Sequence, residues 1–306
     1  MGMDACMLCP RMCGVDRESG EKGYCGMDGK LRAARAALHM WEEPCISGTR
    51  GSGAVFFSGC SLRCIFCQNY EIAQGNCARE ISGDRLSEIF LELQEQGAAN
   101  INLVTATHFA PAVIGALKKA KAQGMYLPVI YNSSGYERVE TVQMLEEVVD
   151  VWLPDFKYMD PELAFACSKA KDYPEVAVAA IREMMLAGGR CEYDDNGYIQ
   201  KGVIVRHLRF NLVIRGSAPY VEWLGQKENP NGFGWATAWN YGISLMNQYT
   251  PLPQVHDIPD LNRRVTKREY EKVLDHALDL GITQGFFQEG GTAKESFIPL
   301  FDYEGL

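Results

Sequence analysis

Along residues 53–280, the pattern of apolar and polar positions alternates between two types. Short apolar runs predict buried strands, and longer stretches with apolar residues at helical spacing predict helices. The expected strands are 54–58, 101–104, 127–131, 149–153, 203–208 and 243–246. The expected helices are 82–96, 111–122, 137–147, 174–186 and 266–280. The stretch 31–41 suits either element, and its periodicity does not decide between them.

Strands that alternate with helices predict βαβ units and a parallel sheet. Roughly six repeats favour an α/β fold of the partial (β/α)6, TIM-like barrel type, with a doubly wound sheet as the alternative. In both folds the chemistry is expected at the carboxyl ends of the strands. We expect a Cys-rich leader over 1–50 and the barrel with a C-terminal extension over 51–306. The aperiodic stretch 225–240 is either a lid or a passive surface insertion.

Composition narrows the class of protein. The chain has 306 residues, a net charge of −9 and a pI near 5.2. It therefore lacks the overall basic character typical of nucleic-acid binding. No apolar run is long enough for a membrane span, and residues 1–14 contain no apolar signal region. The expected location is the cytoplasm, with neither a nucleic-acid nor a membrane partner.

The cysteines gather near the N-terminus. Nine of the 11 lie within residues 1–77, a distribution that favours metal ligands over disulfides in a reducing compartment. Cys60, Cys64 and Cys67 form a C-x3-C-x2-C set directly after the strand 54–58. A cubane iron–sulfur cluster normally takes four thiolates, so three leave one iron open to a small bidentate ligand. The alternatives are a zinc site, which prefers paired C-x2-C elements, and a redox-inert loop.

A second set of four cysteines lies in the leader: Cys6, Cys9, Cys13 and Cys25. Their compact C-x2-C-x3-C-x11-C spacing predicts a closed metal site, for which zinc and an auxiliary iron–sulfur cluster both fit. Free thiols in a flexible tail are the alternative. Cys45 lies between the two sets and is a ligand, a radical-relay thiol or an ordinary buried cysteine.

The loop GCSLRCIFCQN, with Phe66 before its last cysteine, resembles the radical S-adenosylmethionine superfamily. Its context VFFSGCSLRCIFCQN resembles the pyruvate formate-lyase activating enzyme and its homologues. The leader CMLCPRMCGVDRESGEKGYCG, EEPCISG and VRHL resemble uncharacterised homologues of that activase.

The resemblance implies an enzyme whose 4Fe–4S cluster binds S-adenosylmethionine and cleaves it reductively to a 5′-deoxyadenosyl radical. The radical abstracts hydrogen from a protein, a peptide or a small molecule, and activation of a glycyl-radical enzyme is one form of this activity. A reductant such as flavodoxin or ferredoxin is the implied partner. The competing class is a non-catalytic electron-transfer or metal-binding protein.

The resemblance also implies where the cofactor is held. Contacts are expected from the aromatic of the cluster loop and from strand ends: Phe66, Thr105, Thr107, His108, Asn132, Ser133, Asp155, Lys157 and Arg206. The family's second strand ends in a Gly-Gly-Glu-type motif, which here is TATHF. The motif DFK resembles the Asp-x-Lys element of the activases. Structural turns are the alternative role for Asn132 and Ser133.

Arg206 lies inside the apolar strand 203–208, where a charge needs a partner. The cofactor carboxylate is a suitable one. Because successive side chains of a strand point to opposite faces, an Arg206 that faces the barrel interior places His207 toward the helices.

Overall fold

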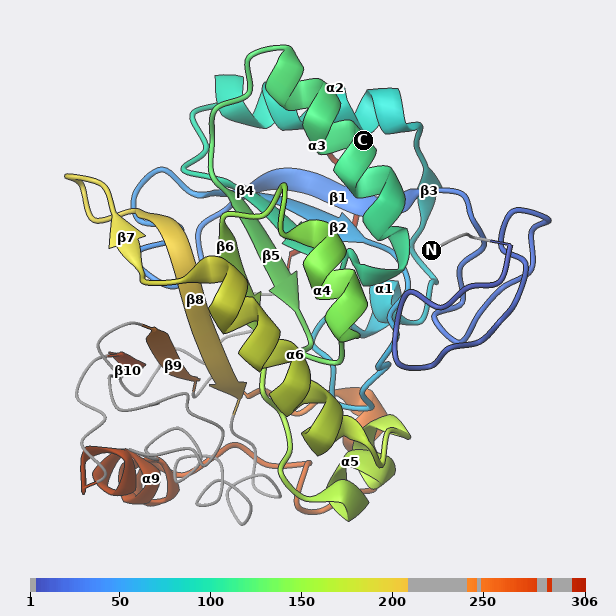
Figure 1. Ribbon diagram of the computed structural model, residues 1–306. Coiled ribbons are helices and arrows are strands. Elements are labelled where there is room, and N and C mark those ends of the chain that lie inside the picture. The colour runs from blue at the N-terminus through green and yellow to red at the C-terminus, as the bar shows by residue number, and fades with distance from the viewer. Residues whose placement is uncertain (1–3, 209–240, 247–248, 280–284, 288–298) are drawn as a thin grey trace.

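The computed structural model describes residues 4–208, 241–246, 249–279, 285–287 and 299–306 (Figure 1). Its strands are β1 Arg32–His39, β2 Ser52–Phe57, β3 Arg79–Glu80, β4 Ile101–Val104, β5 Val129–Ser133, β6 Val151–Pro154, β7 Glu192–Tyr193, β8 Ile199–Leu208, β9 Gly242–Met246 and β10 Phe286–Phe287. Its α-helices are α1 Tyr70–Ala73, α2 Gly83–Glu95, α3 Ala110–Ala122, α4 Val139–Leu145, α5 Pro161–Ser168, α6 Tyr173–Gly188 and α9 Lys267–Asp279. The predicted loop at 225–240 lies outside the described residues.

The strands form one mostly parallel sheet in the order β10-β9-β8-β6-β5-β4-β2-β1-β3, with β7 paired to β8. The strands from β2 to β10 along this order are parallel neighbours. Every residue of β2, β4, β5 and β6 is buried, which is typical of parallel strands covered on both faces. This arrangement confirms the predicted α/β class; within the described residues the sheet stays open.

The expected helices form at the expected places and cover the outer face of the sheet (Figure 1). In α2, the side chain of Ser82 accepts a hydrogen bond from the Arg85 backbone N–H at 3.0 Å, so the helix begins at a capping residue. Its apolar residues Leu86, Phe90 and Leu93 are buried. The predicted helical periodicity therefore matches the face that packs on the sheet.

The ambiguous stretch 31–41 forms β1, which pairs antiparallel with β2. The chain then turns through residues 40–51 and fills the inner side of the sheet. There Cys45 and Ile46 pack against Ile130, Leu153 and Ile204. The Asn100 side-chain amide donates to the Ile46 carbonyl at 2.8 Å, which fixes this turn beside the amino end of β4.

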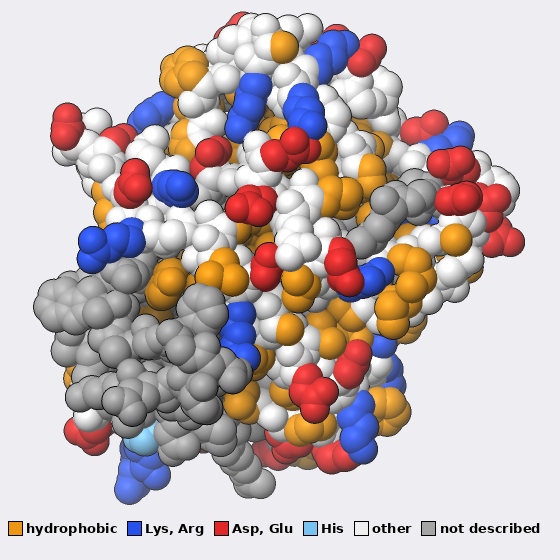
Figure 2. Space-filling model, viewed as in Figure 1, with side chains coloured by type: hydrophobic (Ala, Val, Ile, Leu, Met, Phe, Trp, Pro, Cys, Tyr) orange, Lys and Arg blue, Asp and Glu red, His pale blue; other side chains and the backbone are white. Residues whose placement is uncertain are grey.

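Acidic and basic side chains are interspersed over the helices on the face shown in Figure 2. Ion pairs join neighbouring helices, as between Lys119 and Asp84 at 2.8 Å, and Lys118 reaches Glu147 just beyond α4 at 2.7 Å. Such exposed pairs contribute little stability each. None of the helices in the described part of the chain is long and apolar enough to cross a membrane.

Candidate cluster and cofactor site

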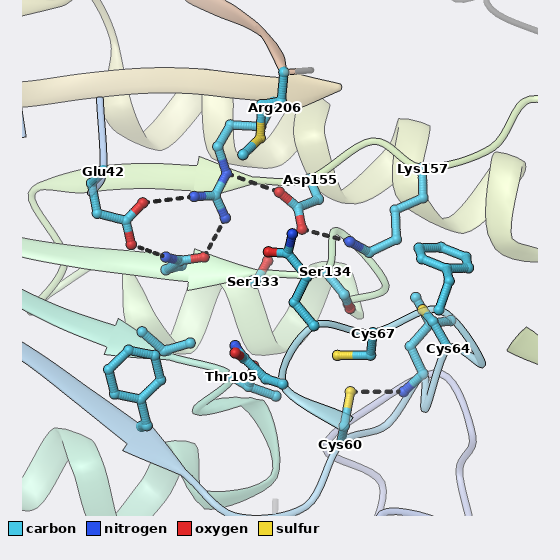
Figure 3. Close-up of a pocket in the computed structure, with 18 of the residues that line it drawn as sticks. Glu42, Cys60, Cys64, Cys67, Thr105, Ser133, Ser134, Asp155, Lys157 and Arg206 are labelled. Carbon is cyan, nitrogen blue, oxygen red and sulfur yellow. Dashed lines mark hydrogen bonds and ion pairs between the residues drawn. The ribbon is translucent and has the colours of Figure 1, made fainter. Parts of the chain in front are cut away.

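A cavity of about 180 Å³ opens at the carboxyl ends of the parallel strands (Figure 3). It brings together the cysteine loop after β2 and polar residues from the ends of β4, β5, β6 and β8. Those predicted from the sequence that line it are Cys60, Cys64, Phe66, Cys67, Thr105, Asn132, Ser133, Asp155, Lys157 and Arg206. The topology thus gathers residues that are up to 146 positions apart in the chain into one site.

The cysteine loop is shaped to present its sulfur atoms. The backbone N–H groups of Leu62 and Arg63 lie 3.4 and 3.5 Å from Cys60 Sγ. Burial raises the pKa of Cys60 to about 11, and burial also raises the pKa of Cys67. Without a metal these thiols stay protonated, whereas coordination to iron deprotonates a thiol outright. Three largely buried thiols facing one cavity, with N–H groups aimed at a sulfur, fit the ligand set of an iron–sulfur cluster.

A chain of four charged side chains crosses the cavity (Figure 3). Arg206 Nε donates to Asp155 Oδ1 at 2.8 Å, and its Nη1 donates to Glu42 Oε2 at 2.9 Å. Lys157 Nζ donates to Asp155 Oδ2 at 2.6 Å. Arg206 Nη2 also donates to Asn132 Oδ1 at 2.5 Å. The charges therefore alternate from the turn after β1 to the loop after β6.

The mutual pairing keeps these groups ionised despite burial. Burial alone raises the pKa of Asp155, but the charges of Arg206 and Lys157 outweigh it and hold the pKa below its usual range. Burial likewise opposes the charge of Lys157, but the charge of Asp155 raises the pKa of Lys157 overall. The site thus offers fixed charges of both signs beside the cysteine loop, as an amino-acid zwitterion requires.

Residues 54–194 match the family model described as the Radical SAM superfamily. The match covers 141 of the 306 residues, which is less than half of the chain. The matched segment contains the three cysteines of the loop and the Asp155–Lys157 pair. Glu42 and Arg206 lie outside it.

The chain is 28% identical to the uncharacterized protein MJ0674 of Methanocaldococcus jannaschii over 280 residues, which are 89% of this chain and 74% of that protein. Streptococcus suis SuiB bound to S-adenosylmethionine aligns with a TM-score of 0.46 and 14% identity over 76% of this chain and 45% of SuiB. A domain of the pyruvate-formate lyase-activating enzyme from Bacteroides vulgatus aligns with a TM-score of 0.39 and 15% identity over 59% of this chain and 92% of that domain. The chain thus spans less than half the length of SuiB.

Thr105 lines the cavity, but Thr107 and His108 do not, which corrects the expectation for these two. Thr107 Oγ1 donates to the buried Glu137 at 2.8 Å, and His108 Nε2 lies 2.7 Å from the Ser58 carbonyl. The reason is a left-handed backbone at Thr105, with φ of 61°, which turns the chain into a 3-10 helix over Thr107–Phe109. A β-branched residue rarely adopts this conformation, so the surrounding structure must impose it.

The expected alternation of side chains along β8 is confirmed. Arg206 faces the cavity, and His207 points the other way, with Nδ1 2.7 Å from the Phe156 carbonyl. Phe66 is 2% exposed, lines the cavity and packs edge-on against Tyr158 at 6.1 Å between ring centroids.

The structure adds cavity residues that sequence reasoning missed: His39, Trp41, Glu42 and Ser134. Glu42 belongs to EEPCISG, a stretch already singled out by its resemblance to activase homologues. Nothing in that stretch indicated that Glu42 reaches the cavity. His39 and Trp41 also line a neighbouring cavity of about 170 Å³, which continues along the inner side of β1 toward Arg35.

The leader cysteines lie behind the loop that carries Cys60, Cys64 and Cys67. Cys6, Cys9 and Cys25 are buried and Cys13 is exposed. Two N–H donors approach these sulfurs, with Arg17 Nη1 3.8 Å from Cys6 Sγ and the Tyr24 backbone N–H 3.2 Å from Cys13 Sγ. Across the described residues, no three or more His, Cys, Asp or Glu side chains are grouped closely enough to hold a single metal ion. A cubane cluster does not require such a group, because each of its cysteines binds a different iron.

Two arginine side chains link the leader to the cysteine loop by hydrogen bonds. Arg11 Nε donates to the Ser61 carbonyl at 2.9 Å, and Arg63 Nη1 donates to the Tyr24 carbonyl at 3.1 Å. The leader therefore supports the back of the loop whose front faces the cavity.

Proposed function

We propose that this protein is a radical SAM enzyme that cleaves S-adenosylmethionine at a 4Fe–4S cluster and abstracts hydrogen from a substrate. The observation that carries the proposal is the cavity that Cys60, Cys64 and Cys67 share with Asp155 and Lys157, all of which lie in the segment that matches the superfamily. Three thiolates on one loop leave one iron for the amino and carboxylate groups of the cofactor.

The side chains around the cavity have separate tasks. The three cysteines would hold the cluster, which when bound and reduced supplies the electron that cleaves the cofactor to a 5′-deoxyadenosyl radical. Lys157 offers an ammonium group to the cofactor carboxylate and Asp155 a carboxylate to its amino group. Phe66 offers an apolar surface beside the adenine. The low exposure of these side chains keeps water away from the reacting atoms.

Asn132, Ser133 and Thr105 contribute hydrogen-bonding groups at the same edge of the sheet. The strained backbone of Thr105 supports its assignment to the cofactor site, because such strain concentrates where function demands it. Arg206 holds Asp155 directly, and two of its five N–H donors are left for a cofactor carboxylate once the three hydrogen bonds described above are made.

For the substrate we propose a protein, a peptide or a small molecule, with activation of a glycyl-radical protein as the specific form. The neighbouring cavity along β1 supports an approach from the side of His39 and Trp41. A stable complex with a glycyl-radical protein would favour the activase. Flavodoxin or ferredoxin is the proposed reductant and the cytoplasm the proposed location.

We propose a second metal centre on Cys6, Cys9, Cys13 and Cys25, either zinc or an auxiliary iron–sulfur cluster. The compact spacing of these residues and the N–H groups near Cys6 and Cys13 support it. Its place behind the cluster loop gives it a structural role in this proposal.

Low-temperature EPR on anaerobically reconstituted, reduced protein tests the main proposal. We expect a cubane signal that changes when S-adenosylmethionine is added, because the cofactor reaches the open iron. A cubane signal that ignores the cofactor would instead indicate an electron-transfer protein. Absence of a cubane signal in protein with full iron content would contradict the cluster assignment.

A further inference from the structure

Glu42 lines the cavity, although in the sequence it precedes the segment that matches the superfamily. It follows β1, and its side chain is only 9% exposed. Oε1 accepts hydrogen bonds from the side-chain amides of Asn102 and Asn132, both at 3.1 Å, while Oε2 accepts from Arg206. This carboxylate therefore links β4, β5 and β8. Figure 3 shows its ion pair with Arg206.

Glu42 completes a balanced set of charges. Glu42 and Asp155 are the two carboxylates of the set, and Arg206 and Lys157 are its two cations. All four side chains are at most 18% exposed, so solvent screens their fields weakly. Without the Glu42 carboxylate, one anion would face two cations, and the set would carry an excess positive charge.

We propose that Glu42 is a positioning residue that holds Arg206 and offsets one of the two cations of this set, so that the site accepts a cofactor of net positive charge. The inference rests on the proposed function. S-Adenosylmethionine carries a carboxylate, an ammonium group and a sulfonium, which sum to +1. S-Adenosylhomocysteine lacks the sulfonium and is neutral, although its carboxylate, amino group, ribose and adenine are the same. The two ligands therefore separate charge from shape.

Anaerobic titration calorimetry on cluster-reconstituted protein tests this role. Both ligands are titrated into the wild type and into Glu42→Gln, which keeps the size of the side chain and removes its charge. We expect the Kd for S-adenosylmethionine to rise on the order of tenfold more than the Kd for S-adenosylhomocysteine. An equal rise for both ligands would mean that Glu42 has only a structural role, and no rise would mean that it has none; either result overturns the inference.

The adjacent residue provides a matched control. Glu43 lies in the same turn and is buried, and in the described structure its Oε2 has no hydrogen-bond partner. Burial raises the pKa of its carboxyl, and among the described residues the ion pairs of Arg206 and Lys157 are made with Glu42 and Asp155 and not with Glu43. We expect the ratio of the two Kd values to stay at the wild-type value in this variant. A shift equal to that of Glu42→Gln would assign the effect to the turn and not to the Glu42 charge.

A second variant covers the case in which Glu42→Gln does not fold. Arg206→Gln removes a cation from the same set, so it should raise the Kd of both ligands. The rise should be smaller for S-adenosylmethionine than for S-adenosylhomocysteine, which is opposite to the effect of Glu42→Gln. A ratio that stays unchanged or moves toward the neutral ligand overturns the inference. A wild type that binds its cluster but neither ligand contradicts the proposed function itself, which separates the two failures.

Discussion

The backbone of Gly59 lies directly against the carbonyl of Cys25, so that a Cβ at residue 59 would come within 2.7 Å of this oxygen. The contact joins the residue before the first cysteine of the cluster loop to the last cysteine of the leader. Gly59 also has a φ of 85°, a conformation that residues with a side chain rarely adopt. The two cysteine sets are therefore built as one packed unit.

Gly59→Ala should separate this unit. The left-handed backbone and the overlap with Cys25 predict a loss of roughly 2–4 kcal/mol in the free energy of unfolding, with less iron retained. Denaturant unfolding and iron analysis measure both. Gly97→Ala is the control, because Gly97 has the same φ of 85° but nothing within 4 Å of an added Cβ. Gly97→Ala should lower the free energy of unfolding by about 1 kcal/mol. Equal losses in the two variants would contradict the contact with the leader.

Cys64→Ala should abolish cleavage of S-adenosylmethionine while the leader metal stays bound, because two thiolates cannot hold the cubane in this loop. The measurements are iron and zinc content and the formation of 5′-deoxyadenosine. Cys77→Ala is a suitable control, since Cys77 lies outside both proposed sites, and it should keep full iron content. Cleavage retained in Cys64→Ala would contradict the assignment of the three cysteines.

The strand-end residues could be predicted because two simple patterns determine them. An apolar run followed by a polar residue identifies the carboxyl end of a parallel strand, and parallel strands bring these ends to one edge. Asp155 and Lys157 were predicted in this way. Strand alternation also gave the opposite directions of Arg206 and His207 correctly.

Other parts of the site depend on geometry that local patterns do not encode. Thr107 and His108 leave the cavity because of the backbone turn at Thr105, and no residue pattern in TATHF signals a positive φ. Glu42 reaches the cavity only because β1 pairs antiparallel with β2 and the following turn fills the inner side of the sheet. Such long-range pairing is a tertiary effect that periodicity cannot supply.

His39 should make stability depend on pH. Burial, assisted by the charges of Arg35 and Arg206, lowers its pKa to about 4 from an ordinary value of 6.5. Its neutral form is favoured on folding, so its contribution is complete above pH 6.5 and is lost as the pH falls toward 4, by at most about 1.4 kcal/mol per pH unit. The comparison is unfolding of the wild type and His39→Gln between pH 4.5 and 7.5.

The difference between the two unfolding free energies should shrink as the pH falls. His256→Gln is the control for the replacement of a histidine at the surface, because the His256 side chain is 79% exposed. A His39→Gln difference that does not change with pH would show that the imidazole is not held in its neutral form.

Cys6→Ala tests the second metal centre. Cys6 is buried beside the guanidinium of Arg17, which also donates to the Asp28 carbonyl at 2.6 Å and so ties the leader together. If a metal joins the four leader cysteines, this variant should lose one metal site per chain, whether zinc or an iron–sulfur cluster, and should unfold at a lower denaturant concentration. Metal analysis and unfolding are measured on the same preparation. An unchanged metal content would remove the leader site, whatever happens to stability, because replacing a buried thiol can weaken packing without any metal.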